Sequence, residues 1–359
     1  MYRAPAQEDA ILRGDRRGTD QRPPNRAVAC LLAAFCGIGA GHYYAGLRRR
    51  ALGWLCAAGA MAVCSVLALP VLARASIFGW ALPVLIGGFV LSWLGPFVDL
   101  CLVPQRHFSR VPLWQVAGYV AAAQLGSMAL SYSVRTWLVE AFKMPSSSMS
   151  PTLLIGDHIF IDKSAGGEAE RGQVVDFEHP EQANQDFIKR VVGMPGDVIQ
   201  MKEGELSING WPVPRCPLGP SSTPGHPPDG GETGVVALEF LDGRAYLTFS
   251  GSEADENGTW TVGAGERFVL GDFRTNSADS RTWFGGRGGG VPLANVKGAA
   301  LGVWMKFDDE GAVDWSRIGV TFHEPVLPSS MRALEPALEK CLRSRPSDVE
   351  TRPPGNVLR

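Results

Sequence analysis

Three serines stand in a row directly after Met144-Pro145, in the stretch FKMPSSSMSPTLLIGDHIF at residues 142 to 160. A serine hydroxyl becomes a nucleophile only when a nearby unprotonated base, usually a histidine, takes its proton. No glycine-flanked serine motif of the Gly-x-Ser-x-Gly kind accompanies the histidines of this part of the chain, which are His158, His179, His226 and His323. Taken alone, the stretch is more typical of a turn, because hydroxyls beside proline bond nearby backbone groups.

A lysine can replace histidine as the base, because burial lowers the pKa of a lysine by several units. Lys189 lies in the apolar run FIKRVV, and in a strand it would share one face with Phe187 and Val191. Arg190 lies among apolar residues in the same way, so alternation does not single out Lys189. An exposed lysine is at least as good an interpretation of this run alone.

Two further segments stand out beside the serine stretch: DFIKRVVGMPGDV at Asp186 to Val198, and GDFRTNSADSR at Gly271 to Arg281. Together with VRTWLVEAFKMPSSSMSPTLLIGDHI they resemble, in the same order, the segments of type I signal peptidase. This is a family of membrane-anchored Ser/Lys proteases that remove signal peptides from exported proteins. RGQVVDFEHP resembles a fourth, structural strand of that family, and the match covers roughly Val134 to Trp304.

The resemblance implies a role for each of these polar residues. Ser148 falls at the nucleophile and Lys189 at the general base. The Ser146 hydroxyl and the Ser148 backbone N–H fall where the oxyanion is stabilised, and losing one such donor costs about 10²–10³ in rate. Ser277 falls where a hydroxyl orients the lysine. Structural support is expected from Asp279, Arg281 and Arg190.

The resemblance also implies where substrate binds. In the family an extended substrate pairs with strands beside the nucleophile, and small pockets select small residues at −1 and −3. The residues that match positions near these pockets are Phe142, Met149, Leu153, Phe187 and Ile188. Packing in the hydrophobic core explains these apolar residues about as well as a role in the pockets.

The chain departs from the family at two places. Phe273 and Thr275 replace polar residues in the third segment, so the loop before Ser277 is expected to pack differently. The stretch WFGGRGGGVP, at Trp283 to Pro292, carries a glycine-rich insertion that is either a mobile flap or a tolerated loop.

The strongly apolar sequence lies almost entirely before residue 134. Ala51 to Ala73, Ala75 to Val98 and Val111 to Val134 lack Asp, Glu, Lys and Arg, and each can cross a bilayer, which takes roughly 20 apolar residues. Ala27 to Leu47 is Gly-rich in its second half, so it is either a fourth span or a re-entrant, interfacial piece.

Basic residues predict the orientation of these spans. Arg48 to Arg50 form one basic loop, and Arg106, His107 and Arg110 form another. Placing both in the cytoplasm puts everything after about Val134 outside. We therefore expect a multi-pass protein of a bacterial cytoplasmic membrane with its catalytic domain on the periplasmic or extracellular face.

The fold class predicted is an N-terminal transmembrane α-helical anchor followed by a mainly antiparallel β catalytic domain of signal-peptidase type. After His158, short apolar runs alternate with turn residues, as in antiparallel β domains. The expected parts are a polar tail at 1–26, the anchor at 27–134, the peptidase domain at 135–330 with a loop insertion at about 217–233, and a short helix and disordered tail at 331–359.

Neither a metal nor another cofactor is expected. The cysteines and histidines lack zinc-site spacing, and the net charge of −2 gives no indication of nucleic-acid binding. Cys216 and Cys341 lie in the outward part, where an oxidising compartment would permit them to pair, but sequence does not supply the geometry.

The resulting hypothesis is a signal peptidase I that cleaves exported preproteins. Its partners would be those preproteins, membrane lipid and the translocation machinery. One alternative is a maturation peptidase dedicated to a particular secretion or pilus system. Another is a non-catalytic membrane scaffold, which loss of Ser148, Lys189 or Ser277 would mark, yet all three are present. Self-cleaving repressors have a similar serine–lysine pair, but these cytosolic regulators lack membrane-spanning segments.

Overall fold

The computed structural model describes residues 23–74, 78–164, 169–222, 232–251, 257–308 and 310–354. The chain forms two compact units, one of Met1–Ala62 and Gly87–Ala129 and one of Val63–Ile86 and Leu130–Arg359. The unit boundaries therefore fall within long helices. Each unit is described by itself.

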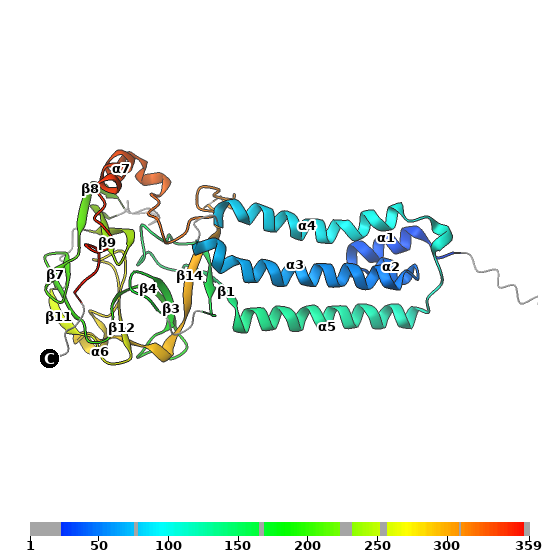
Figure 1. Cartoon of the computed structure of the whole chain (residues 1–359), viewed down its shortest axis with the longest axis horizontal. Helices are drawn as coiled ribbons and strands as arrows, with labels where there is room; N and C mark the ends of the chain where they lie inside the picture. Colours follow the sequence, from blue (N-terminus) through cyan, green and yellow to red (C-terminus); the bar gives the residue numbers. More distant parts are fainter. Residues whose placement is uncertain are drawn as a thin grey trace, which may run out of the picture. The chain divides into compact units, whose positions relative to one another are not determined.

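The first unit is helical. Its elements are α1 (Arg26–Phe35), α2 (Ala40–Tyr44), parts of α3 (Arg48–Arg74) and α4 (Phe78–Leu102), a short 3-10 helix (Gln105–His107), and part of α5 (Leu113–Trp137) (Figure 1). The chain at 27–47 is not one long helix. It breaks between α1 and α2, where Gly37 and Gly39 have φ of 106° and 81°. A β-carbon at Gly39 would lie 2.4 Å from the Tyr119 hydroxyl, so the close packing needs glycine.

Two helices are long and apolar enough to cross a membrane, Arg48–Leu72 and Pro83–Leu102. They match the first two predicted spans. The third predicted span is a helix of 25 residues, α5. It does not reach the same apolarity, because glutamine, serine and tyrosine interrupt its sequence LWQVAGYVAAAQLGSMALSYSVRTW. Among the described residues, this criterion of length and apolarity therefore supports two of the three or four expected spans.

A polar cluster lies inside the first unit and was not predicted from sequence. The Asp99 carboxylate accepts hydrogen bonds from His42 Nε2 at 3.0 Å, Arg50 Nη1 at 2.6 Å and Trp54 Nε1 at 3.0 Å. His42 is fully buried. Because a buried ionisable group needs partners, this cluster holds α2, α3 and α4 together.

The second unit is mainly antiparallel β, as predicted. Its sheets have the strand orders β1-β2-β14-β3-β4-β12-β13, β11-β5-β6-β7 and β10-β9-β8, and neighbouring strands in these sheets are antiparallel (Figure 1). The strands are β1 (Val139–Lys143), β2 (His158–Asp162), β3 (Val174–Glu178), β4 (Asp186–Gly193), β5 (Val198–Lys202), β6 (Glu205–Ile208), β7 (Trp211–Pro212), β8 (Arg215–Ser222), β9 (Thr233–Leu241), β10 (Arg244–Ser250), β11 (Gly258–Thr261), β12 (Glu266–Leu270), β13 (Val291–Pro292) and β14 (Val296–Met305).

The sheet of β1, β2 and β14 rests on an apolar core that includes Met149, Leu153, Ile159 and Val303, each fully buried. This core carries the serine stretch at one edge. The β4 strand lies between β3 and β12, with Lys189 opposite Val175. The lysine strand is therefore central, and its backbone is fixed from both sides.

The predicted loop at 217–233 differs in the structure. Residues 217–222 belong to β8, which pairs with β9 across a register shift between Pro217 and Gly219. An edge strand tolerates proline because one row of its backbone groups needs no partner. Residues 223–231 lie outside the described residues.

The C-terminal part also differs from the prediction. The expected helix is present as α7 (Glu335–Arg343), after a 3-10 helix (Ser329–Leu334), and a disulfide joins Cys341 to Cys216 of β8. The tail, expected to be disordered, is described as far as residue 354. Thr351 is fully buried and accepts backbone hydrogen bonds from Asp242 and Gly243, which anchors this segment on the β9–β10 turn.

Candidate active site

The serine stretch forms a tight turn after β1. The Met144 N–H donates to the Asp157 carbonyl at 2.8 Å, and the Gly156 N–H donates back to the Met144 carbonyl at 2.9 Å. The Ser148 carbonyl accepts from the Phe273 N–H at 3.1 Å. The last of these bonds joins Ser148, in the first of the segments singled out in the sequence, to Phe273 in the third.

Lys189 meets Ser148 directly. Its Nζ donates to Ser148 Oγ at 2.7 Å, and the two residues are 4% and 9% exposed. Burial lowers the pKa of Lys189 to about 8, although Asp279 and Asp272 act in the opposite direction. A lysine with this pKa is partly neutral near pH 8, so it can accept the serine proton.

Two hydrogen-bond donors lie beside the Ser148 hydroxyl. Ser146 Oγ is 3.2 Å from Ser148 Oγ. The backbone N–H of Ser148 has no hydrogen-bond partner among the described residues. Ser147 Oγ is instead 3.4 Å from the Asn276 side-chain amide, outside this pair of donors. The arrangement suits a tetrahedral oxyanion, which needs donors aimed at the developing charge.

Ser277 lies next to the site without a hydrogen bond to Lys189. Its Oγ is buried and has no partner among the residues that the structure describes. A β-carbon on Gly271 would approach Ser277 Oγ to 2.2 Å and the Ser148 carbonyl to 2.5 Å. Gly271 therefore keeps Ser277 and Ser148 close together, and any larger residue would push them apart.

The predicted supporting residues form buried ion pairs. Arg281 donates to both oxygens of Asp279 at 2.8 and 2.9 Å, and the Gly271 N–H donates to the same carboxylate. Burial alone would raise the pKa of Asp279, but Arg281 and the Gly271 N–H hold it below its usual value. Both groups thus stay charged, and the negative carboxylate contributes to the field around Lys189.

Arg190 was predicted from the sequence to support the fold, but its ion-pair partner Asp272 was not predicted. Arg190 donates to Asp272 at 2.8 and 2.7 Å, and Thr152 donates to the same carboxylate at 2.5 Å. A second missed pair joins Arg317 to Asp157, next to the serine stretch. No local pattern marks these pairs, because the partners lie far apart in sequence.

A cavity of about 280 Å³ opens on the Ser148–Lys189 pair. Three of the predicted pocket residues, Phe142, Phe187 and Ile188, line it. The other two, Met149 and Leu153, are fully buried in the core beneath. Their apolar types suited both interpretations, and the lining of the cavity distinguishes them. Asp176, which sequence reasoning did not single out, also lines this cavity.

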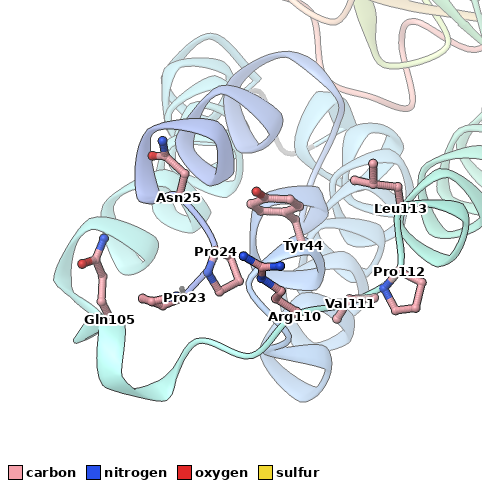
Figure 2. Close-up of a pocket in the computed structure, with 9 residues that line it drawn as sticks. All are labelled: Pro23, Pro24, Asn25, Tyr44, Gln105, Arg110, Val111, Pro112 and Leu113. Carbon is pink, nitrogen blue, oxygen red and sulfur yellow. The ribbon is translucent and has the colours of Figure 1, made fainter. Parts of the chain in front are cut away.

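A larger cavity, of about 970 Å³, lies in the first unit. Figure 2 shows the residues that line it, among them Asn25, Tyr44 and Arg110. It contains no serine, and no lysine that could serve as a base, among its described lining residues. Cavity volume therefore does not identify the active site, and the smaller cavity, beside Ser148 and Lys189, is the candidate.

The two departures from the family pattern are both packed. Phe273 is fully buried and lies edge-on to Phe249 with ring centroids 4.9 Å apart, while the Thr275 hydroxyl accepts from the Gly251 N–H at 2.8 Å. The loop before Ser277 therefore packs on β10. In the glycine-rich insertion a β-carbon on Gly288 would lie 2.2 Å from Trp260 Nε1, so this glycine permits close packing.

Among the described residues, no group of three or more His, Cys, Asp or Glu could hold a metal ion.

Comparison with known proteins identifies the family. The family model described as "Signal peptidase, peptidase S26" matches residues 117–305, over half of this 359-residue chain. The chain belongs to the signal peptidase family. Signal peptidase I of Pseudomonas aeruginosa is 36% identical over 215 residues, which cover 52% of this chain and 73% of that protein.

Other relatives agree. Signal peptidase I of Pseudomonas fluorescens is 36% identical over 211 residues, covering 52% of this chain and 73% of that protein. A crystal structure of a signal peptidase I from Enterococcus faecalis is 23% identical, covers 36% of this chain and 94% of that one, and has a TM-score of 0.23. The sequence relatives show that the function is that of a signal peptidase I, a serine endopeptidase associated with the membrane. The match begins within α5, so α1 to α4 lie outside the family model.

Proposed function

We propose that this signal peptidase cleaves its substrate with Ser148 as nucleophile and Lys189 as general base. The observation that supports the proposal is the 2.7 Å contact between Lys189 Nζ and Ser148 Oγ in a buried position. No histidine is required, because burial brings the pKa of Lys189 to about 8.

The reaction begins when the neutral Lys189 amine takes the Ser148 proton as Oγ attacks the scissile carbonyl carbon. The carbonyl oxygen becomes an oxyanion and receives hydrogen bonds from the Ser148 N–H and the Ser146 hydroxyl. The Lys189 ammonium then gives its proton to the leaving amine, which leaves an ester on Ser148. Lys189 next activates a water molecule that hydrolyses the ester and restores the enzyme.

The substrates proposed are exported preproteins, with small residues at −1 and −3 in the cavity lined by Phe142, Phe187 and Ile188. A cavity of about 280 Å³ suits small side chains. Ser277 is proposed to orient Lys189 once substrate is bound, and Asp279, Arg281 and Arg190 to hold the segments in place. Membrane lipid and the translocation machinery are proposed as further partners.

We also infer a multi-pass topology in which α5 crosses the membrane and the catalytic unit faces outward. The basic residues that flank α3 and α5 support it, because such residues favour the cytoplasmic side. Protection of engineered single cysteines from an impermeant thiol reagent, in inverted and right-side-out vesicles, tests this assignment.

The deciding experiment is cleavage of a preprotein with alanine at −1 and −3 by the detergent-solubilised protein. The wild type is compared with Ser148→Ala and Lys189→Met. Cleavage at the signal junction by the wild type alone would support both catalytic roles. Cleavage by Ser148→Ala would overturn the nucleophile assignment. The dedicated maturation peptidase and the non-catalytic scaffold are not favoured by the family comparisons.

A further inference from the structure

Asp176 is the unusual residue of the cavity. It lies on β3 directly opposite Ile188 of β4, so it is one position away from the strand partner of Lys189. Its side chain is fully buried, and it lines the same cavity as Ser148 and Lys189. Its face of the β3–β4 pair carries the apolar residues Val174 and Ile188, and also the charged residues Glu178, Asp186 and Arg190.

Neither oxygen of the Asp176 carboxyl group has a hydrogen-bond partner among the described residues. Burying a polar group without a hydrogen-bond partner destabilises the fold. The buried carboxyl groups of Asp272 and Asp279 each contact an arginine, so Asp176 is different in kind. A carboxyl group that is buried, unpaired and open to a substrate cavity is suited to receive a polar group from the substrate.

Charged groups on the surrounding strands act on Asp176 without contacting it. They are Asp186 on β4, Lys297 on β14, Glu140 on β1 and Lys163 after β2. Burial, with a smaller contribution from Asp186, raises the pKa of Asp176 to about 7, although Lys297 acts in the opposite direction. The carboxyl group is therefore largely neutral below pH 7, where it can both donate and accept a hydrogen bond.

We propose that Asp176 is a specificity-determining residue, and that it hydrogen-bonds a hydroxyl side chain, serine or threonine, of the preprotein at −1 or −3. A hydroxyl fits because it adds one polar atom to a small side chain and matches a neutral carboxyl group. A lysine or arginine side chain would instead need the ionised form of this buried carboxyl group. The proposal rests on the proposed peptidase function of this site.

The test uses preprotein substrates that are identical except for serine or alanine at −1, and likewise at −3. At pH 6.5 we expect the wild type to favour serine about five-fold in kcat/KM at one of these positions, the worth of about one net hydrogen bond. Asp176→Val should lower that ratio to about one while still cleaving the alanine substrate. Asp176→Asn, which keeps both shape and hydrogen bonding, should retain most of the preference.

Asp186→Glu is the matched control, because Asp186 lines the same cavity but is partly exposed and paired with Lys297, and the substitution keeps its charge. It should leave the serine preference unchanged. An equal ratio for wild type and Asp176→Val at both positions would overturn the proposal, as would a preference for lysine over serine. Absence of Ser148-dependent cleavage of every substrate would instead refute the proposed function, and the proposal about Asp176 with it. If the Val variant fails to fold, Asp176→Ala takes its place, and the same loss of the serine preference is expected.

Discussion

The Arg190 guanidinium and the Asp272 carboxylate form a two-point ion pair, with N···O distances of 2.8 and 2.7 Å, in the interior of the catalytic unit. Arg190 follows Lys189 on β4, and Asp272 lies in the segment that carries Ser277. Thr152, four residues after Ser148, donates to the same carboxylate. The pair thus ties together the three segments that build the site.

Breaking this pair should damage both stability and activity. Asp272→Ala leaves Arg190 buried without its counter-ion, which typically costs about 3–5 kcal/mol. We expect a loss of that size in the free energy of unfolding of the detergent-solubilised protein, with kcat reduced in parallel. The control is Glu339→Ala, whose partner Arg343 is exposed, and it should change stability by under about 1 kcal/mol. Equal effects of the two substitutions would contradict the structural role.

The pH dependence of cleavage should reveal Lys189 as the base. Because burial brings the pKa of Lys189 to about 8, kcat/KM should rise about tenfold per pH unit below that value and level off above it. The profile should be measured on Asp176→Asn as well, since the pKa of Asp176 is raised to about 7 and would otherwise contribute. A rise that continues to about pH 10.4, the ordinary lysine value, would show that the base is not buried.

Lys189→Met should be inactive yet more stable than the wild type at neutral pH. The folded state holds the pKa of Lys189 below its unfolded value of 10.5. The unfolded chain therefore binds the proton more tightly, and the lysine destabilises the fold at all pH values below about 8. The gain from Lys189→Met is on the order of 3 kcal/mol. It should shrink as pH rises from 8 to 10.5, which thermal melts at several pH values would measure.

Ser146→Ala should lower kcat about 10²-fold or more with little change in KM, because an oxyanion donor acts mainly in the transition state. Ser147→Ala provides the matched control. Its hydroxyl lies beside Asn276 and not beside Ser148, so its kcat should stay within a few-fold of the wild type. A Ser146→Ala enzyme with unchanged kcat would remove Ser146 from the mechanism.

Sequence patterns indicated which polar residues come together at this site better than they indicated the ion pairs that support them. Ser148 and Lys189 were identified because their segments carry local patterns, and the structure brings them within 2.7 Å. Asp272 and Asp157 were missed because their partners, Arg190 and Arg317, lie 82 and 160 residues away. Such pairing depends on the whole fold.

Local sequence also could not separate core from cavity. Met149 and Ile188 are both apolar and are the chain neighbours of Ser148 and Lys189, the proposed catalytic residues, yet only Ile188 lines the cavity. The C-terminal tail was expected to be disordered from its polar composition, but Thr351 satisfies backbone groups of the β9–β10 turn. One buried threonine is enough to order a segment whose composition gives no such signal.

The disulfide joins Cys216 to Cys341, which are 125 residues apart in the sequence. The loop that it closes contains Asp272, Ser277, Asp279 and Arg281. Ser148 and Lys189 lie before it. A disulfide of this kind typically contributes about 2–4 kcal/mol by restraining the unfolded chain. The redox condition of the buffer is therefore an experimental variable for this enzyme. If dithiothreitol reduces the disulfide, the segment that carries Asp272, Ser277, Asp279 and Arg281 loses this restraint, whereas the segments of Ser148 and Lys189 lie outside the loop that it closes.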